Sequence, residues 1–384
     1  MARLEEICSL ITDGSHFSPE DEGVGYPMFS VKDMTPNGFN ISGCKKIGEE
    51  AYKKLVANGC KPLNDDVVVA KDGSYLKTAF VIKGNPEITL LSSIAILRPK
   101  IDLVVPEYLS YFLKSDAVYR TVSLNYITGT ALKRIILKGI RKIEVDLPDI
   151  GEQEQRAQRL SKVDYLCQLR KQQLAKLDEL VKARFVEMFG DINVNNKNWM
   201  TYPLGELCTI VRGGSPRPIE RYLGGTIPWI KIGDATTGEN IYLNSTKEYI
   251  IQEGVKKSRM IKAGSLIFAN CGVSLGFARI ITFDGCIHDG WLAMEDIDEK
   301  LDKIFLLYSL NQMTEYFRKT APAGTQPNLN TNIMKMHRQI VPPMEMQKAF
   351  ISFVKCADRQ KQIVQQSLEK LELMKKALMQ EYFG

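Results

Sequence analysis

The sequence lacks the motifs by which common enzyme classes hold a nucleotide or a metal ion. The 384 residues contain no G-x-x-x-x-G-K-[ST] phosphate loop, no H-E-x-x-H and no Asn/Asp-Pro-Pro-aromatic motif of the amino-methyltransferase type. Only three histidines are present, so acid–base chemistry would fall to carboxylates or lysines. These absences argue against a self-sufficient catalyst.

Cysteine pairs are also missing. None of the eight cysteines lies at C-x-x-C spacing, which argues against a zinc site or a redox pair. Cys8 and Cys208 occupy equivalent positions in apolar surroundings, where we expect each to behave as a small buried hydrophobic residue.

Long apolar runs are absent. Stretches such as 90–97 and 266–268 are far shorter than the roughly 20 residues that a membrane span needs, so we expect no membrane association. The first ten residues include Glu5 and Glu6 and no apolar signal segment, so we expect a cytoplasmic protein. The formal charge of +6 permits an anionic partner without proving one.

What the sequence does contain is an internal repeat, and 384 residues exceed the roughly 100–150 of one typical domain. A shift of 200 positions matches the start of the chain to a second copy, and small insertions change the shift to 201 and then 199. A shift of 194 gives the densest match. Its pairs include Gln153 with Gln347, Asp164 with Asp358, Leu174 with Leu368, Leu177 with Leu371 and Gly190 with Gly384.

The densest segment predicts a long helix at the end of each copy. Asp149 and Glu152 resemble a capping box, and Gly190 suits the position after a helix. A helix over about 152–189 would be roughly 57 Å long, more than a compact module needs. We therefore expect it to project or to pair.

Apolar residues at mostly three- and four-residue spacing predict a coiled-coil seam between the two helices. The predicted seam comprises Leu160, Val163, Leu174, Leu177, Val181, Val354, Ala357, Val364, Leu368, Leu371, Met374 and Leu378. The repeat predicts antiparallel pairing, and it also predicts that residues 1–190 alone would self-associate through the exposed seam. The alternative is two surface helices, each packed on its own module.

Within each module, short β-rich runs alternate with Gly, Asn, Pro and Asp. We expect strands at 67–70, 80–82 and 90–97, with counterparts at 229–232, 265–268 and 277–281. One helix per module is expected, at 106–122 and 302–317, and 191–198 reads as a linker. The predicted fold class is α+β: two α/β modules joined by two long antiparallel helices that form a coiled-coil spacer.

Several loops carry side chains that could contact a ligand. The segment 324–330 (GTQPNLN) is amide-rich, and amides can read an adenine edge or bind phosphate oxygens, although turn and capping roles are equally open. Basic residues near glycine and proline suit phosphate and guanine contacts, while solvated surface charge is the alternative. For the three histidines two roles stay open: a side chain that is exposed or satisfied by its neighbours, and a polar contact to a ligand.

These features together resemble the specificity subunit of a type I DNA restriction-modification system. The resemblance rests on 324–330 running on through 340–343 (IVPP) to Gln347, and on Leu132–Lys133 running on to Gln155 in the first copy. The segment 13–16 (DGSH) resembles the family's loop after the first strand. The first copy departs from the pattern at 129–132 (GTAL), where the second copy has the amide-rich loop.

The resemblance implies target-recognition domains at 1–150 and 191–345 and spacer helices at 151–190 and 346–384. It implies double-stranded DNA, two modification (methyltransferase) subunits and a restriction (translocase and nuclease) subunit as partners. S-adenosylmethionine, ATP and Mg would be bound by those subunits, with no cofactor, metal or catalytic residue on this chain. Because the module loops differ, the implied target is bipartite and asymmetric.

The implied DNA-contacting residues lie in loops and at strand ends of both modules. They are Asp13, Gly14, Ser15, His16, Lys32, Lys71, Ser74, Lys77, Arg134, Arg212, Ser215, Arg217, Arg221, Lys231, Asn270, Arg279, His288, Gln326, Asn328 and Asn330. Two other classes stay open: a coiled-coil adaptor without a nucleic-acid role, and a stand-alone DNA-modifying enzyme. The enzyme would need a cofactor motif, and the adaptor would need no clustered charge on its modules.

Overall fold

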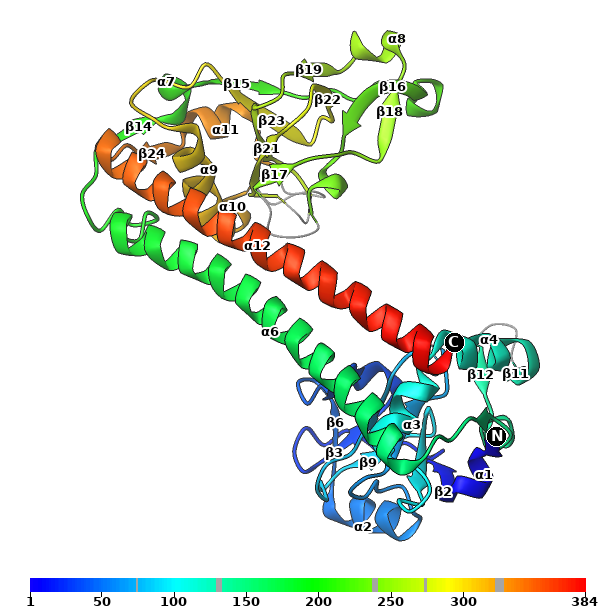
Figure 1. Ribbon diagram of the computed structural model, residues 1–384. Coiled ribbons are helices and arrows are strands. Elements are labelled where there is room, and N and C mark those ends of the chain that lie inside the picture. The colour runs from blue at the N-terminus through cyan, green and yellow to red at the C-terminus, as the bar shows by residue number, and fades with distance from the viewer. Residues whose placement is uncertain (74, 129–132, 237–240, 273–274, 322–327) are drawn as a thin grey trace. The chain divides into compact units, whose positions relative to one another are not determined.

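A computed structural model of the chain describes residues 1–73, 75–128, 133–236, 241–272, 275–321 and 328–384 (Figure 1). Of the predicted contact residues, Ser74 and Gln326 lie outside this range. The described chain forms two compact units, one of residues 1–171 with 366–384 and one of residues 172–365. Each unit holds one module together with part of both long helices.

The first module contains short strands, five α-helices and one 3-10 helix within its described residues. In order they are β1 (Ala2–Arg3), α1 (Leu4–Ile7), β2 (Cys8–Asp13), β3 (Tyr26–Phe29), the 3-10 helix η1 (Val31–Asp33), β4 (Met34–Thr35), β5 (Gly38–Phe39), β6 (Lys45–Ile47), α2 (Glu49–Ala57), β7 (Val67–Ala70), β8 (Ala79–Val81), β9 (Thr89–Leu90), β10 (Ile94–Pro99), α3 (Pro106–Leu113), α4 (Asp116–Asn125), β11 (Ile127–Thr128), β12 (Arg134–Ile135), α5 (Leu137–Arg141) and β13 (Glu144–Val145).

A four-stranded antiparallel sheet in the order β2-β10-β7-β8 is central to this module, and a second sheet has the order β6-β3-β9. Strand β7 is a continuous apolar run because both of its faces are buried. Val67 and Val69 face the core that contains α3, whereas Val68 faces a separate core with Phe29. Such a run is typical of a strand covered on both sides.

The second module repeats this plan. Its elements are β14 (Thr201–Pro203), α7 (Leu204–Leu207), β15 (Thr209–Arg212), η2 (Ile219–Arg221), β16 (Leu223–Ile230), η3 (Ile232–Asp234), β17 (Tyr242–Leu243), β18 (Glu248–Ile250), α8 (Gln252–Val255), β19 (Arg259–Ile261), β20 (Leu266–Ala269), β21 (Ala278–Ile281), β22 (Gly285–Ile287), β23 (Trp291–Glu295), α9 (Lys303–Gln312), α10 (Thr314–Thr320), α11 (Thr331–Met336) and β24 (Arg338–Ile340).

The sheet orders confirm the repeat seen in the sequence. In the second module β15-β23-β20-β21 corresponds to β2-β10-β7-β8, with β17 added at the edge, and β18-β16-β22 corresponds to β6-β3-β9, with β19 added. The terminal pairs β1–β13 and β14–β24 also correspond. Two equivalent modules have therefore diverged mainly in their loops and edge strands.

The predicted helices at 106–122 and 302–317 are each broken in two. Ser115 caps the second segment, α4, by accepting a hydrogen bond from the Val118 amide. In the second module α9 ends at Gln312 and α10 begins at Thr314. The apolar pattern continues across both breaks, so periodicity alone did not reveal them.

The two long helices are α6 (Ile150–Phe189) and α12 (Met344–Phe383). The Asp149 side chain accepts a hydrogen bond from the Glu152 amide, as the predicted cap requires. Gly190 follows α6 with a φ of +78° and donates to the Val186 carbonyl, so its predicted place after the helix is confirmed. Glycine reaches this left-handed conformation without strain.

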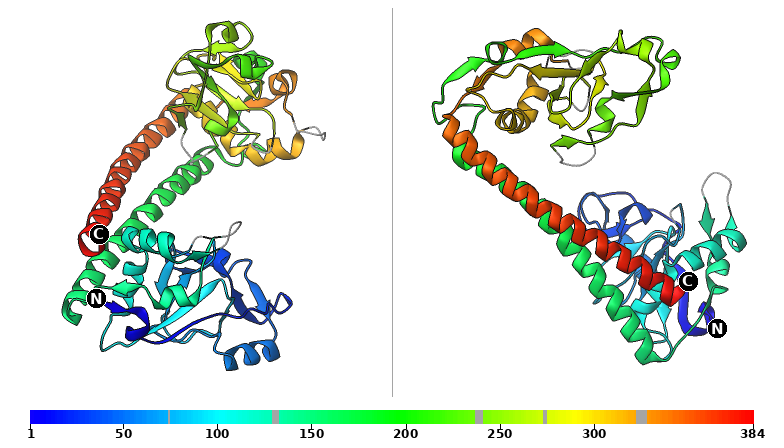
Figure 2. Two further views of the ribbon diagram at one scale, coloured as in Figure 1. Left: turned by 90° about the vertical axis from the view of Figure 1, so that its right-hand side faces the viewer. Right: turned by 45° about the horizontal axis from the view of Figure 1, so that its top comes forward.

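The helices pair antiparallel within each unit, in agreement with the sequence. In the first unit the early residue Arg156 of α6 donates to the carbonyl of Tyr382, near the end of α12. In the second unit the late residue Phe185 of α6 contacts Phe350, near the start of α12, with ring centroids 5.3 Å apart. Figure 2 shows α6 and α12 lying alongside one another in both views.

Burial along the helices refines the predicted seam. Seven of its twelve residues are buried: Leu160, Val163, Val181, Val354, Ala357, Val364 and Leu368. Leu174, Leu177, Leu371 and Leu378 are half-buried. Met374 is 53% exposed, so its assignment to the seam is wrong. The neighbouring seam position is filled instead by Lys375, which pairs with Asp164.

Both helices also pack on the modules, so the seam and the alternative of module packing coexist. Ala157 and Leu160 belong to the core of the first module, which Phe383 joins from α12. Phe185 and Phe350 belong to the core of the second module. Among the described helices, none combines the length and the apolarity that crossing a membrane requires.

Candidate nucleic-acid interface

The loop after β2 and the loop after β15 have equivalent backbone positions, but the shift of 200 misaligns them by one residue. The Gly14 amide donates to the Ile94 carbonyl at the start of β10, and the Gly213 amide donates to the Trp291 carbonyl at the start of β23. Gly14 is therefore equivalent to Gly213, not to Gly214. The misalignment arises because β2 contains one extra residue. Ser9 has no partner on β10, where the register shifts between Leu10 and Cys8.

Close backbone approach explains the glycine at this turn. A Cβ atom on Gly14 would lie 2.1 Å from the Leu90 carbonyl oxygen, and one on Gly213 would lie 2.2 Å from the His288 carbonyl oxygen. Either substitution would force the two chain segments apart. Gly14 is therefore needed for the backbone path of the loop, and it has no side chain with which to contact a ligand.

In the first module the loop after β2 is built around a buried ion pair. The Lys71 ammonium lies 2.6 Å from the Asp13 carboxylate, and the two side chains are only 10% and 11% exposed. His16 Nε2 lies 3.6 Å from the same carboxylate but is 79% exposed. The ion pair fixes Lys71 at the end of β7, and His16 stays accessible at the surface.

Arg134 joins the same region through the backbone. Asp72 and Arg134 form an isolated antiparallel bridge, and the Ile135 amide donates to the Lys71 carbonyl. The Arg134 side chain is exposed. Asp13, Lys71 and Arg134 therefore come from three distant segments and meet at one end of the central sheet.

In the second module Asp289 connects four of the predicted residues. Its carboxylate accepts a hydrogen bond of 2.8 Å from the Ser215 hydroxyl and lies 3.7 Å from the Arg217 guanidinium. Its carbonyl accepts a hydrogen bond from Arg212 Nε at 3.0 Å. His288 precedes it, with Nδ1 3.0 Å from the carboxylate. Arg217 is 83% exposed and is thus available to a ligand.

His288 is held in one orientation beside this carboxylate. Its Nδ1 accepts a hydrogen bond from the Gly290 amide at 2.9 Å, and its ring packs on Trp229 with centroids 5.4 Å apart. Burial is the main cause that lowers the pKa of His288, against an opposing effect of Asp289.

Asn270 and Asn328 lie together next to the same loop. Asn270 Nδ2 donates to Asn328 Oδ1 at 3.1 Å, and the Asn270 amide donates to the Gly290 carbonyl. Asn270 is fully buried, and its Oδ1 has no hydrogen-bond partner among the described residues. The Leu329 amide donates to the Asn270 carbonyl, which holds the end of the amide-rich segment against the sheet.

The backbone contacts make these two sets of residues equivalent position by position. Arg212 faces Leu292 as Asp13 faces Ala95, so Asp13 corresponds to Arg212. By the pairing of β7 with β10 and of β20 with β23, Lys71 corresponds to Asn270. The Leu329 amide donates to the Asn270 carbonyl just as the Ile135 amide donates to the Lys71 carbonyl. Arg134, which precedes Ile135, therefore corresponds to Asn328. The same three positions therefore carry different chemistry.

Several predicted residues have local structural roles. The Ser15 hydroxyl donates to the Phe17 carbonyl and accepts from its amide, which closes the loop on itself. Asn330 caps α11 by accepting from the Ile333 amide at 3.0 Å, as the capping alternative predicted. Lys231 is ion-paired with Glu248. Lys32 and Arg221 are exposed on the 3-10 helices η1 and η2.

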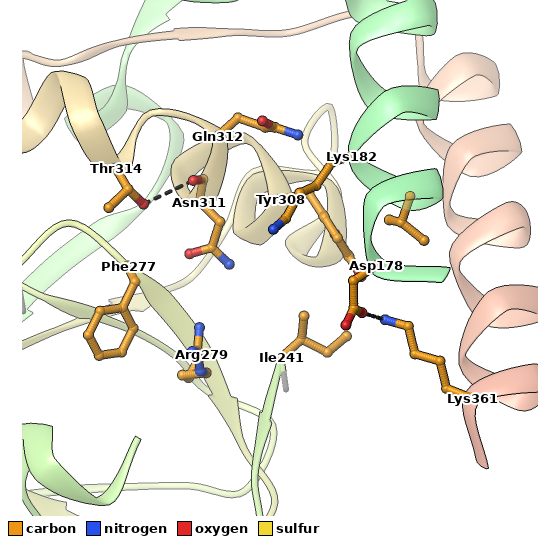
Figure 3. A pocket seen from close by; sticks show the side chains of 11 residues that line it. Asp178, Lys182, Ile241, Phe277, Arg279, Tyr308, Asn311, Gln312, Thr314 and Lys361 are labelled. Carbon is orange, nitrogen blue, oxygen red and sulfur yellow. Dashed lines mark hydrogen bonds and ion pairs between the residues drawn. The ribbon is translucent and has the colours of Figure 1, made fainter. Parts of the chain in front are cut away.

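Lys77 and Arg279 lie beside the long helices. Arg279 lines a cavity of about 210 Å³ with Asp178 and Lys182 of α6, and Figure 3 shows its side chain there next to Phe277. Lys77 lines a cavity of about 360 Å³ with Lys114 and, from α12, Lys375 and Lys376.

Sequence reasoning missed Asp289 and Arg259. Arg259 Nε donates to the Arg212 carbonyl at 3.0 Å, which places a further exposed cation next to the cluster. Asp289 was not chosen, although Asp13 was chosen in the corresponding region of the first module. Its position directly after His288 and before Gly290 was the only signal in the sequence. Within the described ranges no cluster of His, Cys, Asp and Glu is arranged to hold a metal ion.

Comparison with known proteins agrees with this architecture. The family model for the type I restriction modification DNA specificity domain matches residues 1–179 and 196–373. The putative type I restriction enzyme MjaX specificity subunit of Methanocaldococcus jannaschii is 22% identical over 400 residues, which cover 98% of this chain and 90% of the relative. The MjaVIII specificity subunit of the same organism is 23% identical over 85% of this chain and 79% of the relative.

Solved structures share the fold. A chain from a type I R-M system, solved for its complex assembly and conformational transition, has a TM-score of 0.61 at 17% identity, covering all of this chain and 96% of that one. The S subunit of a type I restriction-modification system from M. genitalium has a TM-score of 0.56 at 14% identity, covering all of this chain and 95% of that one. With two copies of the domain matched, the chain belongs to the type I restriction-modification DNA specificity family.

Proposed function

We propose that each module reads one half of a bipartite, asymmetric DNA site, and that the equivalent positions described above distinguish the two halves. The first module offers Asp13, Lys71 and Arg134, and the second offers Arg212, Asn270 and Asn328. This difference at matched backbone positions is the observation that carries the proposal. Twofold-related modules with identical side chains would favour a palindrome instead.

The chemistry of the two sets suits different base edges. Arginine pairs with guanine through O6 and N7, whereas asparagine pairs with adenine through N6 and N7. Exposed Arg217 and Arg134 can reach a base or a phosphate, and His16 can reach a phosphate from its accessible position. Asn270 is buried, so its role would be to hold the Asn328 amide in the reading orientation.

The chain would act without catalytic residues of its own and would dock two modification subunits along α6 and α12, together with a restriction subunit. The pseudo-repeat supports two modification subunits because it presents two related surfaces. S-adenosylmethionine, ATP and Mg would be bound by those subunits. The cytoplasm, where the host DNA lies, is the expected location.

The test is to map methylated sites in host DNA when the complete system carries single substitutions. Arg134→Ala should relax one position of the first half-site, and Asn328→Ala one position of the second, each at a cost of about 1–3 kcal/mol. Lys54→Ala removes an exposed charge on α2 and should leave the motif unchanged. A continuous motif, or one half-site altered by both variants, would refute the division of labour.

A further inference from the structure

Two ion pairs cross the seam between α6 and α12, one in each unit. In the first unit Lys375 Nζ lies 2.6 Å from Asp164 Oδ1. In the second unit Lys361 pairs with Asp178, as the dashed line in Figure 3 marks. All four side chains are between 23% and 37% exposed, so water screens them only in part.

The two pairs have the same polarity and the same register. The aspartates both belong to α6 and stand fourteen residues apart, and the lysines both belong to α12 and also stand fourteen residues apart. Fourteen residues are two heptads, so both pairs occupy the same face of the coiled coil. In both of these pairs the acidic partner belongs to α6 and the basic partner belongs to α12.

The repeat shows what each helix would face if it paired with a copy of itself. At the shift of 194, Lys375 corresponds to Val181 and Lys361 corresponds to Cys167. In an α6–α6 pair of the same register, Asp164 would therefore face Val181, and Asp178 would face Cys167. A partly buried carboxylate without its cation destabilises a pairing.

The same exercise for α12 gives the opposite result. Asp164 corresponds to Asp358 and Asp178 corresponds to Glu372. In an α12–α12 pair Lys375 would face Asp358 and Lys361 would face Glu372. Both contacts would be attractive, so only α6 rejects its own copy.

We propose that these four residues form a pairing code, in which α6 accepts α12, from its own chain or from a second copy, and rejects another α6. The code opposes the self-association of residues 1–190 that the apolar seam alone predicts. Lys171–Glu372, at 3.2 Å, has the reverse polarity, but its side chains are 62% and 52% exposed and contribute little. Tyr111 also donates to Asp164, at 2.9 Å, and this neutral donor would remain in either pairing.

The test uses full-length chains with the charges exchanged. One variant carries Asp164→Lys and Asp178→Lys, a second carries Lys361→Glu and Lys375→Glu, and a third carries all four. Each double variant places like charges across the seam, so its melting temperature should fall by at least about 2 °C. The fourfold variant restores opposite charges and should recover at least half of the combined loss. Simple addition of the two losses would overturn the code.

Partner choice is tested by mixing the two double variants, which carry different tags. In the mixture, α6 of each variant can pair with α12 of the other variant, because those two helices carry opposite charges at the seam. Sedimentation and native mass spectrometry should therefore find a one-to-one assembly that neither variant forms alone. Equal formation of homodimers and mixed dimers would refute the proposed selectivity. A matched control exchanges Lys171 and Glu372, and this exposed pair should show neither the loss nor the recovery.

Discussion

Acid should destabilise the second module through one buried imidazole. Burial lowers the pKa of His337 from 6.5 to about 4, and its ring contacts Phe317 with centroids 5.1 Å apart. Its Nε2 has no hydrogen-bond partner within the described part of the chain. The folded state therefore resists protonation that the unfolded chain accepts.

The sign and size of the effect follow from linkage. Because the folded pKa is the lower one, the contribution to stability is fully present above about pH 6.5 and is lost progressively as the pH falls to about 4. One pKa unit corresponds to 1.36 kcal/mol, so the loss approaches about 3 kcal/mol at the acidic limit. His337→Phe cannot take up a proton and should remove this part of the pH dependence.

The assay is denaturant unfolding of the parent and His337→Phe between pH 7.5 and 4.5 at constant ionic strength. Carboxylates titrate in both chains, so the difference between the two curves isolates the imidazole. Phe305→Leu, a substitution in the same core, should lower stability equally at every pH. Parallel curves for the parent and His337→Phe would refute the reasoning.

Four further outcomes are expected. Burial lowers the pKa of Lys114 to about 8, so Lys114→Met should raise the free energy of unfolding by up to about 3 kcal/mol below pH 8, an advantage that disappears as the pH rises toward 10.5 in denaturant titrations. Gly14→Ala should displace the loop from Leu90 and weaken binding to the first half-site in a DNA-binding titration, while Gly233→Ala, with open space around its Cβ, should not. Deleting one heptad from each long helix in register removes about 10 Å and should shorten the unread spacer of the methylated motif by about three base pairs, with both half-sites unchanged. The purified chain should not bind S-adenosylmethionine in calorimetry, and methyl transfer by the chain alone would contradict a non-catalytic role.

The sequence predicted those features that depend on periodicity and repetition. The long helices, the cap at Asp149, the turn at Gly190 and the antiparallel pairing all follow from local patterns and from the shift of 194. The buried cysteines follow from their apolar neighbours, and burial raises the pKa of Cys8 and of Cys208 to about 12. The cap, the turn and the buried cysteines are each determined by residues close together in the chain, and the pairing follows from the repeat.

The candidate site was only partly predictable because its members come from distant segments. Asp13 and Lys71 were each predicted as contacts. Their ion pair forms because β2 and β7, which flank β10, end at the same edge of the sheet. Asn330 and Asn328 are two residues apart in one amide-rich loop, yet one caps a helix and the other contacts Asn270. Composition cannot separate these roles, since the same amide serves both.

The extra residue in β2 limits how modules can be exchanged between relatives. Its one-residue offset arises inside the strand, at Ser9, and the loop that directly follows β2 inherits it. A chimera joined within 9–13 by aligning residue identities would leave the recognition loop one residue too long or too short. Junctions placed before Leu4 and Leu204, at the starts of α1 and α7, would carry strand and loop together, so recombination there would transfer a complete reading surface.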